Sequence, residues 1–249
     1  MKTVYDGFLA DIYDYCPYFR DRGKEAVFYL NELGSQYSNI LELGTATGSL
    51  TIPLAEAGYM VDTVDFSEDM HRIARRNAAD SAQDISGKIN YILADIVYFN
   101  PQKKYGAVMI PDSLLTIFPE KEKRERILRM CYDALEEGGT LILDVYQPIE
   151  RIIEKGSHKE HSRFRGKNKE VYLVTVNHEV DINEQLHSCV YHYKKWRPAD
   201  DAEDEISIPI TYRYLYPAEV EEALRKTGFH SIQVTEIFDG NINFITAKK

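Results

Sequence analysis

A short segment near the start of the chain places one acidic residue among closely spaced small residues. Residues 41–48 (LELGTATG) follow a dense apolar run. Small residues after a buried strand let the backbone approach a ligand, and a helix that starts there offers unpaired N–H groups. The spacing is similar to a nucleotide-binding loop, but Ala46 replaces the middle glycine and a third glycine is absent. The residues predicted to hold the ligand are Glu42, Gly44, Thr45, Ala46 and Gly48.

The charge of Glu42 indicates which ligand suits this loop. Glu42 lies two residues before Gly44, where a carboxylate would repel a pyrophosphate. An ammonium group would instead be attracted through a charge-assisted hydrogen bond. The methionine part of S-adenosylmethionine (SAM) carries such a group, and NAD does not. The sequence therefore favours SAM and counts against an NAD-dependent oxidoreductase.

Two further acids follow the next two predicted strands. Asp65 lies about twenty residues after the loop, where an acid can accept both ribose hydroxyls. Asp95 could accept a hydrogen bond from an adenine amino group, and the apolar Phe66 and Ile96 beside the two acids could enclose the adenine ring. A lone aspartate is more often a helix cap or a loop residue, but acids at three successive strand ends are typical of a ligand crevice.

A parallel sheet is needed to bring these residues together. Apolar runs predict strands at 40–43, 60–64, 90–94, 105–110 and 140–145, and helices are predicted at 49–57, after Ser67, and at 120–135, with Gly138-Gly139 ending the last helix. Strands that alternate with helices through short loops predict a doubly wound, mostly parallel α/β sheet of Rossmann-like type. Ligands bind such sheets at the carboxyl ends of the strands.

The residue pattern changes after Pro148. Alternating apolar and polar residues predict antiparallel strands at 171–180, 186–196 and 206–216. A helix is expected from Pro217, and then two strands joined by a turn at Asp239-Gly240. Near the N-terminus, Pro17 is expected to begin a second helix. The predicted organisation is a helical lid at 1–35, a cofactor-binding domain formed by 36–147 and 217–249, and an antiparallel substrate cap at 148–216.

Together these motifs resemble the class I SAM-dependent methyltransferase family. The resemblance rests on Glu42, Gly44 and Gly48, on Val64-Asp65-Phe66-Ser67 with Met70, on Ala94-Asp95-Ile96, on the run from Gly138 to Asp144, and on the closing Gly228-Phe229 with its two strands. It implies a sheet of seven strands with SAM as the cofactor. It also implies that Met70 and Ile110 contact the cofactor.

The N-terminal tyrosines point to a narrower group. Tyr5-Asp6 and Tyr13-Asp14 look like the lid helix of small-molecule methyltransferases, such as the sugar N-methyltransferases and glycine N-methyltransferase-like enzymes. That likeness implies that Tyr13 closes over the methionine end of SAM and that Tyr5 contacts the substrate. An amphipathic helix that merely packs its tyrosines explains the pattern equally well.

The acceptor pocket is predicted less sharply than the cofactor site. Ser113, after the fourth strand, and Tyr146, after the fifth, are candidates to line it. The Asn/Asp-Pro-Pro-Tyr motif of enzymes that methylate nucleobases is absent, since Pro111 precedes Asp112. Tyrosines of the cap are more often packing residues than ligand contacts. His178 or His192 could act as a base, but no pattern identifies a catalytic residue.

The expected reaction is methyl transfer from SAM to a nitrogen or oxygen of a small-molecule acceptor. The sulfonium is intrinsically reactive, so the enzyme mainly has to align a nucleophile and exclude water. The alternatives are a C-methyltransferase, an enzyme that uses a modified SAM, and a non-catalytic SAM- or nucleotide-binding protein, because binding motifs do not prove turnover.

Composition restricts partners and location. The formal net charge of -10 disfavours nucleic acid as a partner. The three cysteines, Cys16, Cys131 and Cys189, show no zinc-binding spacing, so we predict free buried thiols and no metal. The opening residues lack a signal-peptide core, and no run is apolar enough to span a bilayer. We expect a cytoplasmic protein without a membrane partner, and a homodimer is compatible with the sequence.

Overall fold

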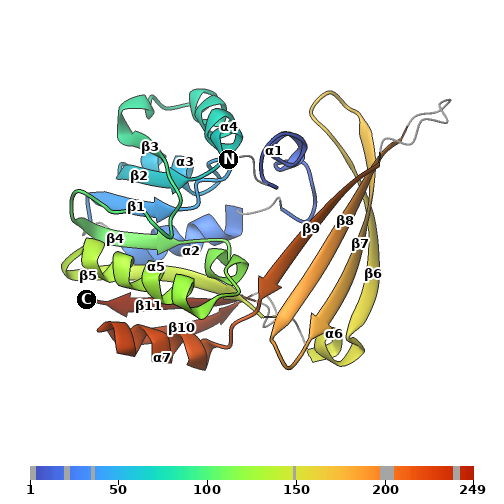
Figure 1. Ribbon diagram of the computed structural model, residues 1–249. Helices are drawn as coiled ribbons and strands as arrows, with labels where there is room; N and C mark the ends of the chain where they lie inside the picture. Colours follow the sequence, from blue (N-terminus) through green and yellow to red (C-terminus); the bar gives the residue numbers. More distant parts are fainter. Residues whose placement is uncertain (1–3, 20–22, 35–36, 148–149, 197–204, 238–241) are drawn as a thin grey trace.

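Two sheets organise the chain (Figure 1). The computed structural model describes residues 4–19, 23–34, 37–147, 150–196, 205–237 and 242–249. One sheet has helices on both faces, and the other is a long antiparallel sheet beside it. None of the helices in the described part of the chain combines the length and hydropathy that crossing a membrane requires.

The larger sheet has seven strands in the order β10-β11-β5-β4-β1-β2-β3. Its parallel strands are β1 (Asn39–Leu43), β2 (Met60–Asp65), β3 (Ile89–Leu93), β4 (Tyr105–Ile110) and β5 (Leu135–Tyr146). The strands β10 (His230–Ile237) and β11 (Ile242–Lys248) pair antiparallel at one edge. This arrangement confirms the predicted Rossmann-like fold of seven mostly parallel strands.

Helices bury the two faces of this sheet separately. One face packs against α5 (Lys121–Ala134) and α7 (Pro217–Thr227), and the other against α2 (Gly23–Leu33) and α3 (Thr51–Glu56). Because both faces are covered, β4 is buried at every position, which explains its continuous apolar sequence. The helix α4 (Glu68–Ala79) begins as predicted, because the Ser67 hydroxyl accepts the N–H of Met70.

The second sheet, here called the cap sheet, lies between β5 and α7 in sequence. It contains β6 (Ser157–Arg165), β7 (Val171–Asp181), β8 (Leu186–Trp196) and β9 (Glu205–Arg213), paired in that order, and α6 (Glu150–Lys155) precedes it. The antiparallel insertion after the fifth strand is therefore confirmed. Strand β6 was not predicted, because its sequence is largely polar and only Phe164 in it is fully buried, as suits an edge strand.

Two expected boundaries are wrong. Pro17 lies in a turn, and in the described residues the second helix begins at Gly23. Gly138-Gly139 does not separate α5 from the fifth strand, because β5 already starts at Leu135. Backbone hydrogen bonds pair this segment with the C-terminus. The N–H of Gly138 donates to the carbonyl of Lys249, and the N–H of Lys249 donates to the carbonyl of Gly139. The predicted turn at Asp239-Gly240 lies outside the described residues.

The N-terminal segment fills the space between the two sheets. The short helix α1 (Phe8–Ile12) belongs to an apolar cluster that also contains Met70 and Ile73 of α4 and the inner face of the cap sheet. Its N-terminal end is tied to α4, since the N–H of Gly7 donates to Asp69 at 2.8 Å. The segment thus stands at the carboxyl ends of the parallel strands, where a ligand would enter.

Candidate functional site

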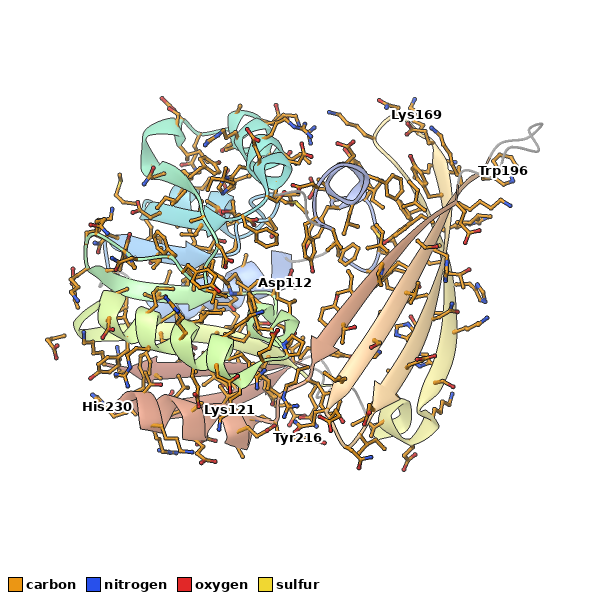
Figure 2. All side chains as sticks on the ribbon, in the orientation of Figure 1. Asp112, Lys121, Lys169, Trp196, Tyr216 and His230 are labelled. Carbon is orange, nitrogen blue, oxygen red and sulfur yellow. The ribbon has the colours of Figure 1, made fainter. Side chains whose placement is uncertain are left out.

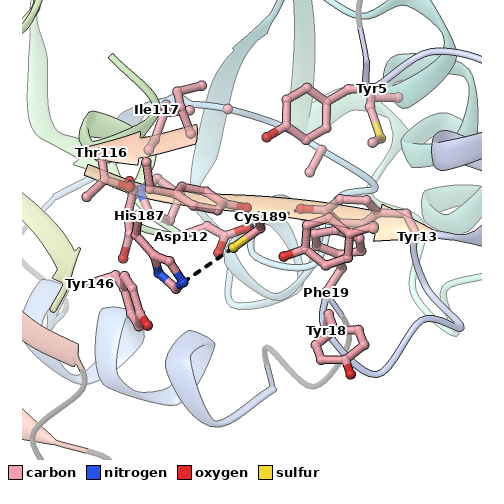
Figure 3. A pocket seen from close by; sticks show the side chains of 18 of the residues that line it. Tyr5, Tyr13, Tyr18, Phe19, Asp112, Thr116, Ile117, Tyr146, His187 and Cys189 are labelled. Atoms are coloured by element: carbon pink, nitrogen blue, oxygen red, sulfur yellow. Dashed lines mark hydrogen bonds between the residues drawn. The ribbon is translucent and has the colours of Figure 1, made fainter. Parts of the chain in front are cut away.

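A pocket of about 300 Å³ lies where the carboxyl ends of the parallel strands meet α1 and the cap sheet. Figure 2 shows Asp112 where these parts meet, and Figure 3 shows the pocket from close by. The predicted residues in its wall are Tyr5, Tyr13, Gly44, Ala46, Asp65, Phe66, Met70, Ser113 and Tyr146. The fold thus gathers residues from the lid, four strand ends and α4 around one cavity.

The other predicted cofactor residues lie outside the pocket wall. These are Glu42, Thr45, Gly48, Asp95, Ile96 and Ile110. Asp95 is exposed and caps its own turn, since its carboxylate accepts the N–H of Val97 at 2.9 Å. Ile96 is 4% exposed and packs in the core. Their contacts with adenine stay predictions from the sequence.

Glu42 of β1 is buried and joins this strand to α3 and β2. Its carboxylate is 1% exposed and accepts hydrogen bonds from the hydroxyls of Thr51 at 2.5 Å and Thr63 at 2.8 Å. Burial raises the pKa of Glu42 to about 7, although the two threonine hydrogen bonds oppose this rise. The structure therefore gives this carboxylate an internal role, and its contact with an ammonium group stays a prediction.

Asp65 connects the loop after β1 to the end of β2. Its two oxygens accept the N–H groups of Ala46 and Ser67, each at 2.9 Å. Ala46 has a φ of +44°, and this hydrogen bond helps to hold it in the left-handed region. Burial raises the pKa of Asp65, although the backbone N–H donors oppose the rise. The carboxylate borders the pocket and keeps lone pairs for further donors.

This end of the pocket suits an adenosine. Phe66, next to Asp65, is 36% exposed and offers an aromatic ring to a flat base. Gly44 has a φ of +85°, and a Cβ there would lie 3.1 Å from the side chain of Leu114. Glycine adopts this backbone conformation without strain and leaves the space beside Leu114 unfilled. The residues present therefore fit SAM, and contacts of Asp65 with the ribose and of Phe66 with the base stay predictions.

The loop after β4 forms another part of the pocket wall. Asp112 and Ser113 have φ values of +61° and +52°. Asp144 of β5 holds this left-handed pair, because one of its oxygens accepts both the N–H (2.7 Å) and the hydroxyl (2.9 Å) of Ser113. Its other oxygen accepts the hydroxyl of Tyr29. Unusual backbone held by a buried carboxylate is typical of a functional site.

The lid contacts this loop directly. The hydroxyl of Tyr13 donates to Asp112 at 3.2 Å, and its ring stacks on that of Phe19 with centroids 5.0 Å apart. Tyr5 contacts Phe66 edge-on at 6.3 Å. Tyr5 thus lies beside Phe66, where adenine is expected, and Tyr13 lies beside the loop after β4.

The cap sheet, the N-terminal segment and the end of β5 contribute hydroxyls that stay protonated. Tyr18, Tyr191 and Tyr212 line the pocket together with Tyr146. Burial raises the pKa of all four, to about 12 for Tyr18. Neutral phenols donate hydrogen bonds and do not act as bases at neutral pH. The sequence predicted packing for the cap tyrosines, and the fold places two of them at the pocket.

Few of the described pocket residues can accept a proton. Asp112 has a carboxylate at the pocket, and His178 and His187 are neutral because burial lowers the pKa of both, to about 4 for His187. His178 was a predicted base candidate. The other candidate, His192, lies outside the pocket wall, with its ring bonded to Ser207 at 2.8 Å. Sequence reasoning missed Asp112 and His187, although the alternation of β8 places His187 on the same face as Tyr191.

The electrostatic character of the pocket is acidic. Its wall, as far as the structure describes it, carries the carboxylates of Asp65 and Asp112 and no lysine or arginine. A cationic or neutral amine can approach these carboxylates, while an anion would find no counter-charge among the described wall residues. The wall is also rich in aromatic rings, which attract cations.

Comparisons with known proteins find similarity to methyltransferases and to an enzyme of SAM chemistry. Residues 40–139 match the family described as a methyltransferase domain. A carboxy-S-adenosyl-L-methionine synthase of Nautilia profundicola is 22% identical over 93% of this chain and 86% of its own length. A glycine/sarcosine N-methyltransferase of Halorhodospira halochloris is 27% identical over 69% of this chain and 64% of its own.

A solved structure shows the same fold along the entire chain. The SAM-bound structure of an amino pentose methyltransferase from Micromonospora echinaspora superposes with a TM-score of 0.77, covers 100% of both chains and is 13% identical. At this identity the likeness concerns the fold, including the cap sheet.

Proposed function

We propose that this protein is a SAM-dependent methyltransferase that acts on a small molecule and transfers the methyl group of SAM to an amine nitrogen. SAM supplies a reactive sulfonium methyl, so the protein has to hold a neutral amine in line with that methyl and exclude water. The observation that carries the proposal is the carboxylate of Asp112, which lies at the pocket under the hydroxyl of Tyr13.

The residues that follow β1 and β2 would bind the cofactor. Asp65 would accept the ribose hydroxyls, and Phe66 and Met70 would contact the adenine. The loop with Gly44 and Ala46 would lie against the methionine part. Tyr13 would close over the reacting end, because it bridges from the lid to Asp112.

Acceptor binding falls to Asp112 and the aromatic wall. An amine enters as an ammonium ion, which the carboxylate and the surrounding tyrosine rings attract. Asp112 then takes a proton from the nitrogen, directly or through water, and leaves the lone pair free to attack the methyl carbon. The bond from that carbon to sulfur breaks as the bond to nitrogen forms, and S-adenosylhomocysteine is the leaving group. The neutral tyrosines cannot serve as this base, since burial raises their pKa.

The pocket wall also restricts the rest of the acceptor. No lysine or arginine occurs among its described residues, so a carboxylate of the acceptor would lack a partner among them. We therefore infer an amine on an apolar or hydroxylated framework, such as an amino sugar or an aryl-alkyl amine. The name of the glycine/sarcosine N-methyltransferase supports nitrogen as the acceptor atom, although glycine and sarcosine carry a carboxylate that the inferred acceptor lacks.

A panel assay tests this proposal. The purified full-length chain is incubated with methyl-labelled SAM and separate sets of amines, alcohols, carbon acids and amino acids, and label transfer is measured. Transfer confined to amines without a carboxylate is the expected result. Transfer to alcohols or carbon acids alone would refute nitrogen as the acceptor. Conversion of SAM itself to a new nucleoside without any amine would instead indicate an enzyme that modifies SAM.

A further inference from the structure

Three side-chain atoms of the types that bind transition metals converge on the cap side of the pocket. Nδ1 of His178 lies 3.0 Å from Nε2 of His187, and Sγ of Cys189 lies 3.3 Å and 3.5 Å from these nitrogens. All three residues are buried and all three line the pocket. Figure 3 marks the contact between His187 and Cys189.

The sheet register explains this convergence. His178 on β7 is directly opposite Cys189 on β8, and His187 precedes Cys189 by two residues on the same face. Because β7 and β8 are long and regularly paired, the three positions are held by continuous backbone hydrogen bonding. The site therefore rests on rigid strands rather than on a loop.

The distances suit a tetrahedral ion. Zinc binds histidine nitrogen at about 2.0–2.1 Å and cysteine sulfur at about 2.3 Å, so its ligand atoms lie roughly 3.3–3.7 Å apart. The observed separations of 3.0, 3.3 and 3.5 Å are a few tenths of an ångström from this range. Small side-chain rotations would complete the geometry.

The outer nitrogens of the two imidazoles are available to carry the protons when the inner nitrogens bind a metal. Nε2 of His178 and Nδ1 of His187 are buried and have no hydrogen-bond partner among the described residues. If the inner nitrogens bind a metal, the outer ones carry the protons, and a carboxylate commonly receives such an N–H. An oxygen of Glu160 lies 3.9 Å from Nε2 of His178, beyond hydrogen-bond distance, and a small side-chain shift would bring it to that N–H.

We propose that His178, His187 and Cys189 bind one divalent transition-metal ion, preferentially zinc, whose fourth position is open to the pocket. Three protein ligands with one open position are typical of zinc sites that bind water or a substrate atom. Cys189 binds as the thiolate, so its proton is released to solvent when the metal enters. The proposal goes beyond methyl transfer and does not depend on the identity of the acceptor.

Metal binding to the full-length chain tests the site without an activity assay. The chain is stripped with a chelator and then titrated with Zn²⁺ in competition with a metal indicator, and with Co²⁺ while thiolate-to-cobalt charge-transfer absorption is recorded. We expect one equivalent of either metal, with proton release on binding. Less than one equivalent of Zn²⁺, or Co²⁺ binding without the charge-transfer band, would overturn the proposal.

Matched variants separate this site from adventitious binding. Cys189→Ala and His178→Gln should each weaken Zn²⁺ binding at least about tenfold, while Cys131→Ala and His192→Gln should not. Glu160→Gln alters a half-exposed residue and keeps the three ligands, and it should weaken binding by about tenfold or more. Circular dichroism confirms that each variant is folded. Unchanged affinity in folded Cys189→Ala and Glu160→Gln would show that the metal binds elsewhere.

Discussion

The hydroxyl of Tyr13 lies 3.2 Å from the carboxylate of Asp112, although 99 positions separate the two residues. This contact joins the lid to the loop after β4 across the pocket. It places a hydroxyl donor and a carboxylate side by side at the pocket. The reacting atoms are expected at this point.

Asp112→Asn should reduce kcat by about 100-fold or more and leave SAM binding unchanged. Asparagine tolerates the left-handed backbone at this position but cannot accept a proton as a carboxylate does. Steady-state kinetics with an amine acceptor measures the effect, and activity should recover partly at high pH, where free amine is abundant. A kcat close to that of the wild type would remove Asp112 as the base.

Asp65→Ala should weaken binding of S-adenosylhomocysteine by about 1–3 kcal/mol through the lost ribose hydrogen bonds. Isothermal titration calorimetry measures this change, with the exposed Asp84→Ala as control. Asp95→Ala belongs in the same series, because the sequence predicts an adenine contact that the pocket wall does not include. Unchanged affinity in a folded Asp65→Ala variant would exclude Asp65 from the cofactor site.

Asp144→Ala should lower the free energy of unfolding by about 2–4 kcal/mol. The substitution leaves the N–H and hydroxyl of Ser113 and the hydroxyl of Tyr29 without their buried acceptor. Urea denaturation followed by circular dichroism measures the loss, and Asp133→Ala on an exposed face of α5 is the control. A loss below about 1 kcal/mol would mean that the loop after β4 does not depend on Asp144.

Glu42→Gln should become more stable relative to the wild type as pH rises. Burial raises the pKa of Glu42 to about 7 from an ordinary value of 4.5, so the folded state binds the proton more tightly than the unfolded state. The stability due to this proton is complete below pH 4.5 and is lost as pH rises towards 7. Between pH 5 and pH 8, the difference in unfolding free energy should shift by about 1–3 kcal/mol in favour of Glu42→Gln. A constant difference over this range would contradict the shift.

Sequence patterns were most informative for the sheet of seven strands. Continuous apolar strands, capped helices and small-residue turns are local signals, and Ser67 caps α4 as its sequence predicts. Polar β6 was missed because edge strands need few buried residues. The segment at Gly138 was misassigned, since its pairing partner is Lys249 at the other end of the domain.

The sequence by itself determined the fold class and the acids at the strand ends, because the spacing of apolar residues predicts where each strand begins and ends. It could not decide which of those acids face the pocket. Glu42 turns to Thr51 and Thr63, whereas Asp65 stays at the cavity. Packing of distant segments also decided which residues share the pocket. Asp112 meets Tyr13, and His178 meets Cys189, only through lid docking and strand register, neither of which has a local signal in the sequence.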